Sequence, residues 1–148
     1  MRILGIDPGL VIMGYALLEE DRLSAWGRFK GKGTWEERLF QGAEFVEGKI
    51  DELFPDEVAI EAPFTGANPS SAIKLAHLKG ALMYVVWKKG IPVYEYSPRE
   101  IKKAITGRGN ASKQEVRNFV GRIFRQVSGY DEADAVALAF THYLMRGR

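Results

Sequence analysis

Four acidic residues stand where their carboxylates could act together. Asp7 and Glu61 each end a short apolar run typical of a buried strand, while Asp131 and Asp134 open the last predicted helix. A spacing of three residues places the last two acids on one helix face. Four neighbouring carboxylates cannot all stay ionised without a cation. Because neither Cys nor a nearby His joins them, the ligand set predicts Mg²⁺, with Mn²⁺ as the alternative, rather than zinc.

A carboxylate site of this kind suits chemistry at phosphorus. Two divalent ions about 3.5–4 Å apart can orient an attacking water and stabilise the leaving oxygen of a phosphodiester. The pattern therefore predicts metal-assisted phosphodiester hydrolysis, provided that the fold brings the four acids together.

Each acid also has a purely structural interpretation. Asp7-Pro8-Gly9 is ordinary turn chemistry, in which the Asp side chain bonds its own backbone. Asp131 could be a helix N-cap, and Asp134 an acid favoured by the helix dipole. The sequence alone leaves both interpretations open.

Positive charge gathers in one part of the chain. The net charge is only +2, but residues 97–128 carry eight basic residues against two acids. A local surplus of this kind is the electrostatic footprint of a polyanion-binding protein, although a solvated helix face is the commoner cause for any single helix. The basic residues are Arg99, Lys102, Lys103, Arg108, Lys113, Arg117, Arg122 and Arg125. On the helix that begins near Ser112, the spacing predicts that the arginines point mostly outward.

The composition is that of an ordinary globular domain. With 148 residues and 46% apolar residues, the chain is expected to form a single domain, residues 1–148, with a real core. It has no cysteine, which excludes disulfides and thiol chemistry. No apolar stretch has the length of a signal peptide core or a membrane span, so we expect a soluble, cytoplasmic protein.

The hydrophobic patterns predict an α/β fold. Three strands in an antiparallel meander come first, followed by a helix and two further strands that alternate with helices. Three Ser/Thr-x-x-Glu patterns, beginning at Thr34, Ser97 and Ser112, predict capping boxes at helix starts. The expected strands are 2–7, 12–19, 22–30, 57–61 and 91–96, and the expected helices are 34–54, 70–89, 97–107, 112–129 and 131–145.

Parallel strands end at the same edge of a sheet, and ligands collect at that edge in open α/β folds. If strands one and four are parallel neighbours, Asp7 and Glu61 lie side by side.

Phe64 follows in a Pro/Gly-rich loop, where it is either a functional aromatic or folded onto the core. The helix 70–89 is apolar on two sides, which predicts that it contributes to a homodimer interface. His77 and His142 are expected to be structural or solvent-facing.

Several motifs, in order and over nearly the whole length, resemble the RuvC family of Holliday junction resolvases, within the RNase H-like superfamily. They are Gly5 to Tyr15, Ile60-Glu61-x-x-Phe64 with Asn68, Tyr94-Glu95-Tyr96-Ser97-Pro98, Ile101-Lys102-Lys103, Gly107-x-Gly109-x-Ala111-x-Lys113 and Asp131-x-Ala133-Asp134-Ala135. Each motif is short, but their common order and spacing make the match specific.

The resemblance implies an RNase H-like fold with a five-stranded mixed sheet flanked by helices. It also implies a homodimer that nicks four-way DNA junctions symmetrically in recombination and repair, using two Mg²⁺ ions per subunit, alongside the RuvA and RuvB branch-migration proteins. By this resemblance Asp7, Glu61, Asp131 and Asp134 are the catalytic metal ligands. Phe64 is the aromatic that stacks on a junction base, and Lys102 and Lys113 contact phosphates near the cut.

Three other functions remain open from the sequence. A nucleotide-binding fold of the actin and sugar-kinase type also begins with an acid after strand one, but it needs two domains around the nucleotide. A module could bind branched DNA without cutting it. A related nuclease of the same fold could act on structured RNA.

Overall fold

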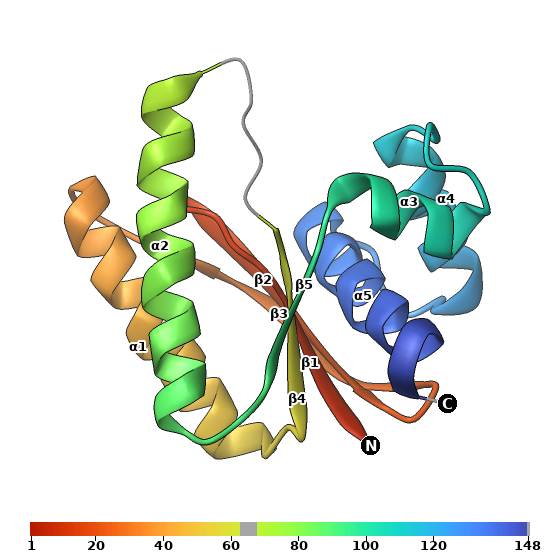
Figure 1. Ribbon diagram of the computed structural model, residues 1–148, viewed down its shortest axis with the longest axis horizontal. Coiled ribbons are helices and arrows are strands. Elements are labelled where there is room, and N and C mark those ends of the chain that lie inside the picture. The colour runs from red at the N-terminus through yellow and green to blue at the C-terminus, as the bar shows by residue number, and fades with distance from the viewer. Residues whose placement is uncertain (63–67, 148) are drawn as a thin grey trace.

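A five-stranded mixed sheet forms the centre of the computed structural model, which describes residues 1–62 and 68–147 (Figure 1). The sheet order is β3-β2-β1-β4-β5. β2 pairs antiparallel with both β1 and β3, whereas β4 pairs parallel with β1 and β5. This confirms the predicted meander followed by parallel strands. The strands are β1 Arg2–Asp7, β2 Ile12–Glu19, β3 Arg22–Lys30, β4 Glu57–Glu61 and β5 Val93–Tyr96.

Helices cover both faces of the sheet, with α1 and α2 on one face and α5 on the other, where α3 and α4 lie beyond it (Figure 1). All three predicted capping boxes form, at the starts of α1, α3 and α4. Among the described residues, no helix is both long and apolar enough to cross a membrane. The helices are α1 Trp35–Leu53, α2 Pro69–Lys88, α3 Pro98–Thr106, α4 Lys113–Ile123 and α5 Tyr130–His142, with a π-helical turn at Tyr143–Gly147.

The two faces of the sheet are packed differently. Large side chains such as Leu4, Leu78 and Leu82 fill the space under α1 and α2. On the other face α5 comes so close that a Cβ on Gly5 would lie 2.3 Å from the backbone oxygen of Ala135. A Cβ on Gly14 would lie 2.0 Å from the backbone oxygen of Asp131. These two glycines therefore set how α5 lies against the strands.

Some element boundaries differ from the predicted ones. β5 starts at Val93 rather than residue 91, because Pro92 has no N–H to donate to the neighbouring strand. α4 ends at Ile123, where the N–H of Phe124 bonds the carbonyl oxygen of Val120, well before residue 129. The last α-helix ends at His142 and continues as the π-helical turn, rather than as one helix to residue 145.

Candidate active site

Asp7 and Glu61 end neighbouring parallel strands. Ile6 of β1 is in register with Ile60 of β4, so the next residue of each strand is one of the two acids. Adjacent strands lie about 4.8 Å apart. The prediction that these two carboxylates stand side by side at one edge of the sheet is confirmed.

The first turn of α5 brings the second pair of acids to the same edge. Gly14 of β2 pairs with Asp7, and the position of its missing Cβ is 3.3 Å from the Cβ of Asp131. The capping interpretation of Asp131 is wrong, because α5 begins at Tyr130 with Gly129 as its N-cap and no side-chain cap bond. Asp131 is therefore held beside Asp7 with its side chain free of a capping role.

A cleft of about 340 Å³ joins these acids to the basic helices. Glu61 and Asp134 line it together with Lys102 and Lys113, and the Nζ of Lys113 lies 3.4 Å from Oδ2 of Asp134. Apolar side chains and small residues complete the wall: Pro98, Ile101, Val116, Ala137 and Leu138. The structure thus brings both predicted phosphate-binding lysines to the edge that carries the acids.

Asp7 lies at the centre of this negative charge. Burial, followed by the charges of Asp134 and Glu61, raises the pKa of Asp7 from 3.8 to about 7, and Asp131 adds to the rise while Lys113 opposes it. Within residues 1–62 and 68–147 the Asp7 carboxylate has neither a hydrogen bond nor an ion pair. The interpretation of Asp7 as a turn residue bonded to its own backbone is therefore wrong.

Asp134 has the opposite environment. Arg117 donates to both of its oxygens, from Nε to Oδ1 at 3.1 Å and from Nη2 to Oδ2 at 3.0 Å. The Nζ of Lys113 lies 3.4 Å from Oδ2. The hydrogen bonds to Asp134 raise the pKa of Arg117, whose guanidinium also lies over the Tyr130 ring at 4.3 Å.

For Arg117, the predicted outward orientation is wrong, because its side chain is only 20% exposed and points at the acids. The sequence held one signal for this position. Lys113 and Arg117 are four residues apart and therefore share a helix face. Once Lys113 is assigned to the site, this spacing predicts that Arg117 also faces it.

Lys79 is a second residue that the sequence analysis missed. It is only 5% exposed, and its Nζ donates to the carbonyl oxygen of Ala62 at 3.0 Å, directly after Glu61. Burial lowers the pKa of this ammonium, while the charges of Glu61, Asp7 and Glu95 oppose the decrease. The signal was a lysine on the apolar face of α2, one residue after the buried Leu78.

The remaining predicted residues lie as follows. Phe64 falls outside the described residues. His142 is fully buried and structural, with Nε2 2.6 Å from Oε1 of Glu57 and Nδ1 2.6 Å from the hydroxyl of Tyr96. His77 is exposed on α2. The prediction that the histidines are structural or solvent-facing is confirmed.

The chemistry of the site fits a hard cation. Four carboxylates converge, Asp7 lacks a partner among the described residues, and their mutual charge raises its pKa. As the side chains lie, no three acids or histidines in the described part of the chain surround a single point closely enough to hold an ion. The two bonds from Arg117 keep both oxygens of Asp134 engaged.

Comparison with known proteins decides the family. Residues 3–142 match the family described as crossover junction endodeoxyribonuclease RuvC. The chain belongs to the RuvC family. RuvC proteins are metal-dependent endodeoxyribonucleases, so this protein is a nuclease, and the nucleotide-binding and non-cleaving alternatives are wrong.

Individual RuvC proteins agree with this assignment. The crossover junction endodeoxyribonuclease RuvC of Porphyromonas gingivalis is 40% identical over 152 residues, covering 95% of this chain and 80% of that protein. The Thermus thermophilus RuvC in complex with Holliday junction substrate is 29% identical with a TM-score of 0.88, covering 98% of this chain and 94% of that one. The yeast mitochondrial resolvase Ydc2, 13% identical with a TM-score of 0.69 and coverage of 97% and 79%, shares the fold.

Proposed function

We propose that this RuvC protein resolves four-way DNA junctions by paired nicks, through hydrolysis assisted by two divalent ions. The observation that carries the proposal is Asp7, a carboxylate with a raised pKa and with three further acids around it. Such a cluster stores repulsion that a divalent cation relieves. Two of the acids, Glu61 and Asp134, line a cleft that is also lined by Lys102 and Lys113, which suits a phosphodiester backbone.

The four acids, Asp7, Glu61, Asp131 and Asp134, are proposed to hold the ions. Mg²⁺, or Mn²⁺ in its place, supplies an activated water and stabilisation of the leaving oxygen when bound. Asp7 and Glu61 are fixed by the strands, so they provide the rigid half of the ligand set. Before all four acids can bind the ions, Asp134 has to exchange at least one hydrogen bond from Arg117 for a bond to the metal.

The cations of the cleft are proposed to position the DNA. Lys102 and Lys113 contact the phosphates beside the cut, where their charge also offsets the charge that develops at phosphorus. Lys79 holds the carbonyl of Ala62 and thereby the end of β4 that carries Glu61. Phe64, by family resemblance, stacks on a base at the junction.

A homodimer would place two such sites on one junction. The outer face of α2 carries three large apolar side chains, Ile73, Tyr84 and Trp87, which are 61%, 59% and 73% exposed. Pairing of this face with a second copy would bury it. Light scattering after size-exclusion chromatography should give the dimer mass, and a monomer at micromolar concentration would contradict this part of the proposal.

The choice of substrate is supported by the T. thermophilus RuvC, which was solved in complex with Holliday junction substrate. Resemblance to the family adds a role in recombination and repair, cooperation with RuvA and RuvB, and a cytoplasmic location. The role, the protein partners and the location follow from the family resemblance alone, because the residues described above bear only on the binding and cleavage of DNA.

The deciding experiment uses a labelled four-way junction and a linear duplex of the same sequence, each with Mg²⁺ or with chelator. We expect symmetric nicks in the junction with Mg²⁺ only, and little cutting of the duplex. Equal cutting of both DNAs, or nicking that persists in chelator, would contradict the proposal. A structured RNA of similar size tests the remaining alternative in the same assay.

A further inference from the structure

Two basic residues on the edge strand β3 lie close to the acids, on the side away from α3 and α4. Arg28 pairs across the sheet with Gly14, and Gly14 pairs with Asp7, so the three residues form one row. Two strand spacings separate Arg28 from Asp7, which is about 10 Å. Lys30 lies further along β3, which runs parallel to β1 because both are antiparallel to β2.

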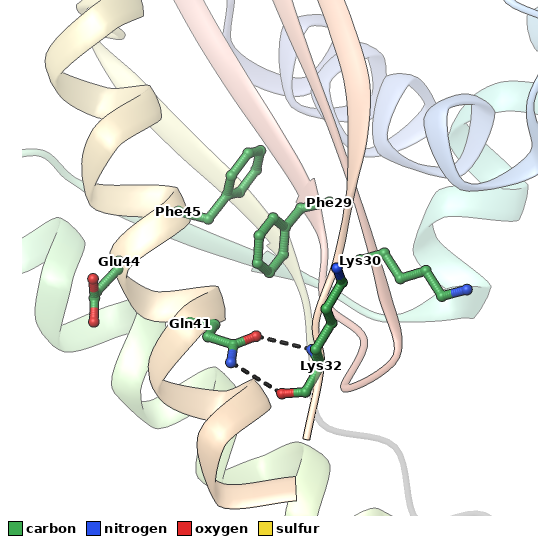
Figure 2. A pocket seen from close by; sticks show the side chains of 6 residues that line it. All are labelled: Phe29, Lys30, Lys32, Gln41, Glu44 and Phe45. Carbon is green, nitrogen blue, oxygen red and sulfur yellow. Dashed lines mark hydrogen bonds between the residues drawn. The ribbon is translucent and has the colours of Figure 1, made fainter. Parts of the chain in front are cut away.

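Arg28 and Lys30 face the same side of the sheet as the acids. Side chains alternate along a strand, and Phe29 between them stacks on Phe45 of α1 at 4.6 Å, on the opposite side. Figure 2 shows the side chain of Lys30 extending away from these two rings. Their row also contains Gly14, whose missing Cβ points at Asp131. The pair therefore borders the acid cluster.

Both side chains are exposed and unpaired. In the described ranges, neither Arg28 nor Lys30 forms a hydrogen bond or ion pair through its side chain. Arg22, at the other end of the same strand, pairs with Glu19 at 2.7 Å. Exposed cations without internal partners are free to neutralise phosphates and thereby release the counterions condensed on the DNA.

The backbone beyond these cations is held in place. The N–H of Lys32 donates to Oε1 of Gln41 at 2.9 Å, and Nε2 of Gln41 donates to the carbonyl oxygen of Lys32 at 3.0 Å (Figure 2). The N–H of Gly31 donates to the carbonyl oxygen of Val11 at 3.1 Å. The end of β3 is thus tied both to α1 and to the segment before β2, so the two cations project from a fixed support.

We propose that Arg28 and Lys30 form a second phosphate-binding surface for the substrate DNA, across the acids from Lys102 and Lys113. This proposal rests on the proposed function and adds to it the path that the cleaved DNA strand follows across the protein surface. A DNA strand cut beside Asp7 would reach Arg28 within a few phosphates of the cut. The DNA would then be held on both sides of the cut, which adds binding affinity at a distance from the scissile phosphate.

The test is the salt dependence of junction binding by the full-length protein, measured with a labelled four-way junction in chelator so that no cleavage occurs. For the double variant Arg28→Gln/Lys30→Gln, the dissociation constant at about 0.1 M salt should rise by well over tenfold. The slope of log K against log salt should become shallower by about 2 for each subunit that binds the junction, since each lost phosphate contact contributes about 0.9. The matched control Arg22→Gln removes one charge from the other end of β3 and should leave both quantities unchanged.

Single-turnover cleavage with Mg²⁺ at saturating protein separates this proposal from the proposed function. The double variant should cut within about twofold of the unmodified rate, because its binding defect is overcome at saturation. Unchanged affinity and slope in a folded double variant would overturn the β3 surface while the nuclease function stands. Failure of the unmodified protein to nick junctions would overturn the function, yet the binding slopes would still test the β3 surface.

Discussion

Asp7 and Asp134 are neighbours in the acid cluster, but their surroundings are opposite. Asp7 is fixed at the tip of a central strand, has no partner in the described structure, and has a pKa raised to about 7. Asp134 lies on a helix and is bonded by Arg117 through both oxygens. One half of the site therefore lacks a cation, whereas the other half holds a side-chain cation in its place. The difference suggests a rigid half that recruits the metal and an exchangeable half that closes on it.

Removal of the recruiting acid should have the largest effect. We expect Asp7→Asn to slow single-turnover junction cleavage by about a thousandfold or more, because a metal ligand that contributes several kcal/mol is lost. Junction binding in chelator should stay intact, because the lysines of the cleft are untouched. A variant that still cuts at a tenth of the normal rate would show that Asp7 is not central.

The raised pKa of Asp7 also predicts how stability depends on pH without metal. Folded Asp7 releases its proton near pH 7 and the unfolded chain near 3.8, so stability falls as the pH rises between these values, by about 4 kcal/mol in total. Asp7→Asn removes this penalty. In chelator, its stability relative to the unmodified protein should therefore grow by about 2–3 kcal/mol between pH 5 and pH 8. Urea unfolding measures the difference, and a constant difference would contradict the assigned cause.

Asp131 sharpens the comparison, because it shares a helix with Asp134 but receives no capping or ion-pair contact from the described residues. Asp131→Asn should reduce cleavage about a hundredfold, as expected for loss of a charged metal ligand. The melting temperature should change by about 2 °C at most, since only a helix-dipole contribution is lost. A large decrease in melting temperature with activity retained would make Asp131 a structural residue.

The smallest expected effect concerns the exchangeable half. Arg117→Gln removes a positive charge that competes for Asp134, so Mn²⁺ should bind about three- to tenfold more tightly in calorimetry. Arg122→Gln, on the same helix but over the Phe119 ring and away from the acids, is the matched control. Unchanged or weaker Mn²⁺ binding in the Arg117 variant would mean that Arg117 supports the site rather than competing for it.

Local patterns predicted most of the fold. The antiparallel meander and the three capping boxes follow from strand runs and from interactions between residues three apart. The parallel neighbourhood of β1 and β4 was only a condition for Asp7 and Glu61 to lie side by side, and the structure meets it. The predicted start of α5 was wrong by one residue, which removed the capping interpretation of Asp131. Helix ends depend on a few local hydrogen bonds, so periodicity alone does not fix them.

The rest of the site depends on packing between distant segments. The roles of Gly5 and Gly14 are visible only once α5 lies against β1 and β2. The inward turn of Arg117 requires α4 beside α5, and the place of Arg28 in the row of Asp7 requires the pairing of three strands. A spacing pattern in one helix or strand contains none of these contacts.

The central claim is that Asp7 and its neighbouring acids converge on divalent ions, and a crystal grown with Mn²⁺ tests it most directly. The account predicts anomalous density bonded to the carboxylate of Asp7 and to Glu61 or Asp134, with Arg117 released from at least one oxygen of Asp134. Saturating Mn²⁺ that leaves Asp7 without an ion and the pair of Arg117 and Asp134 intact would contradict it.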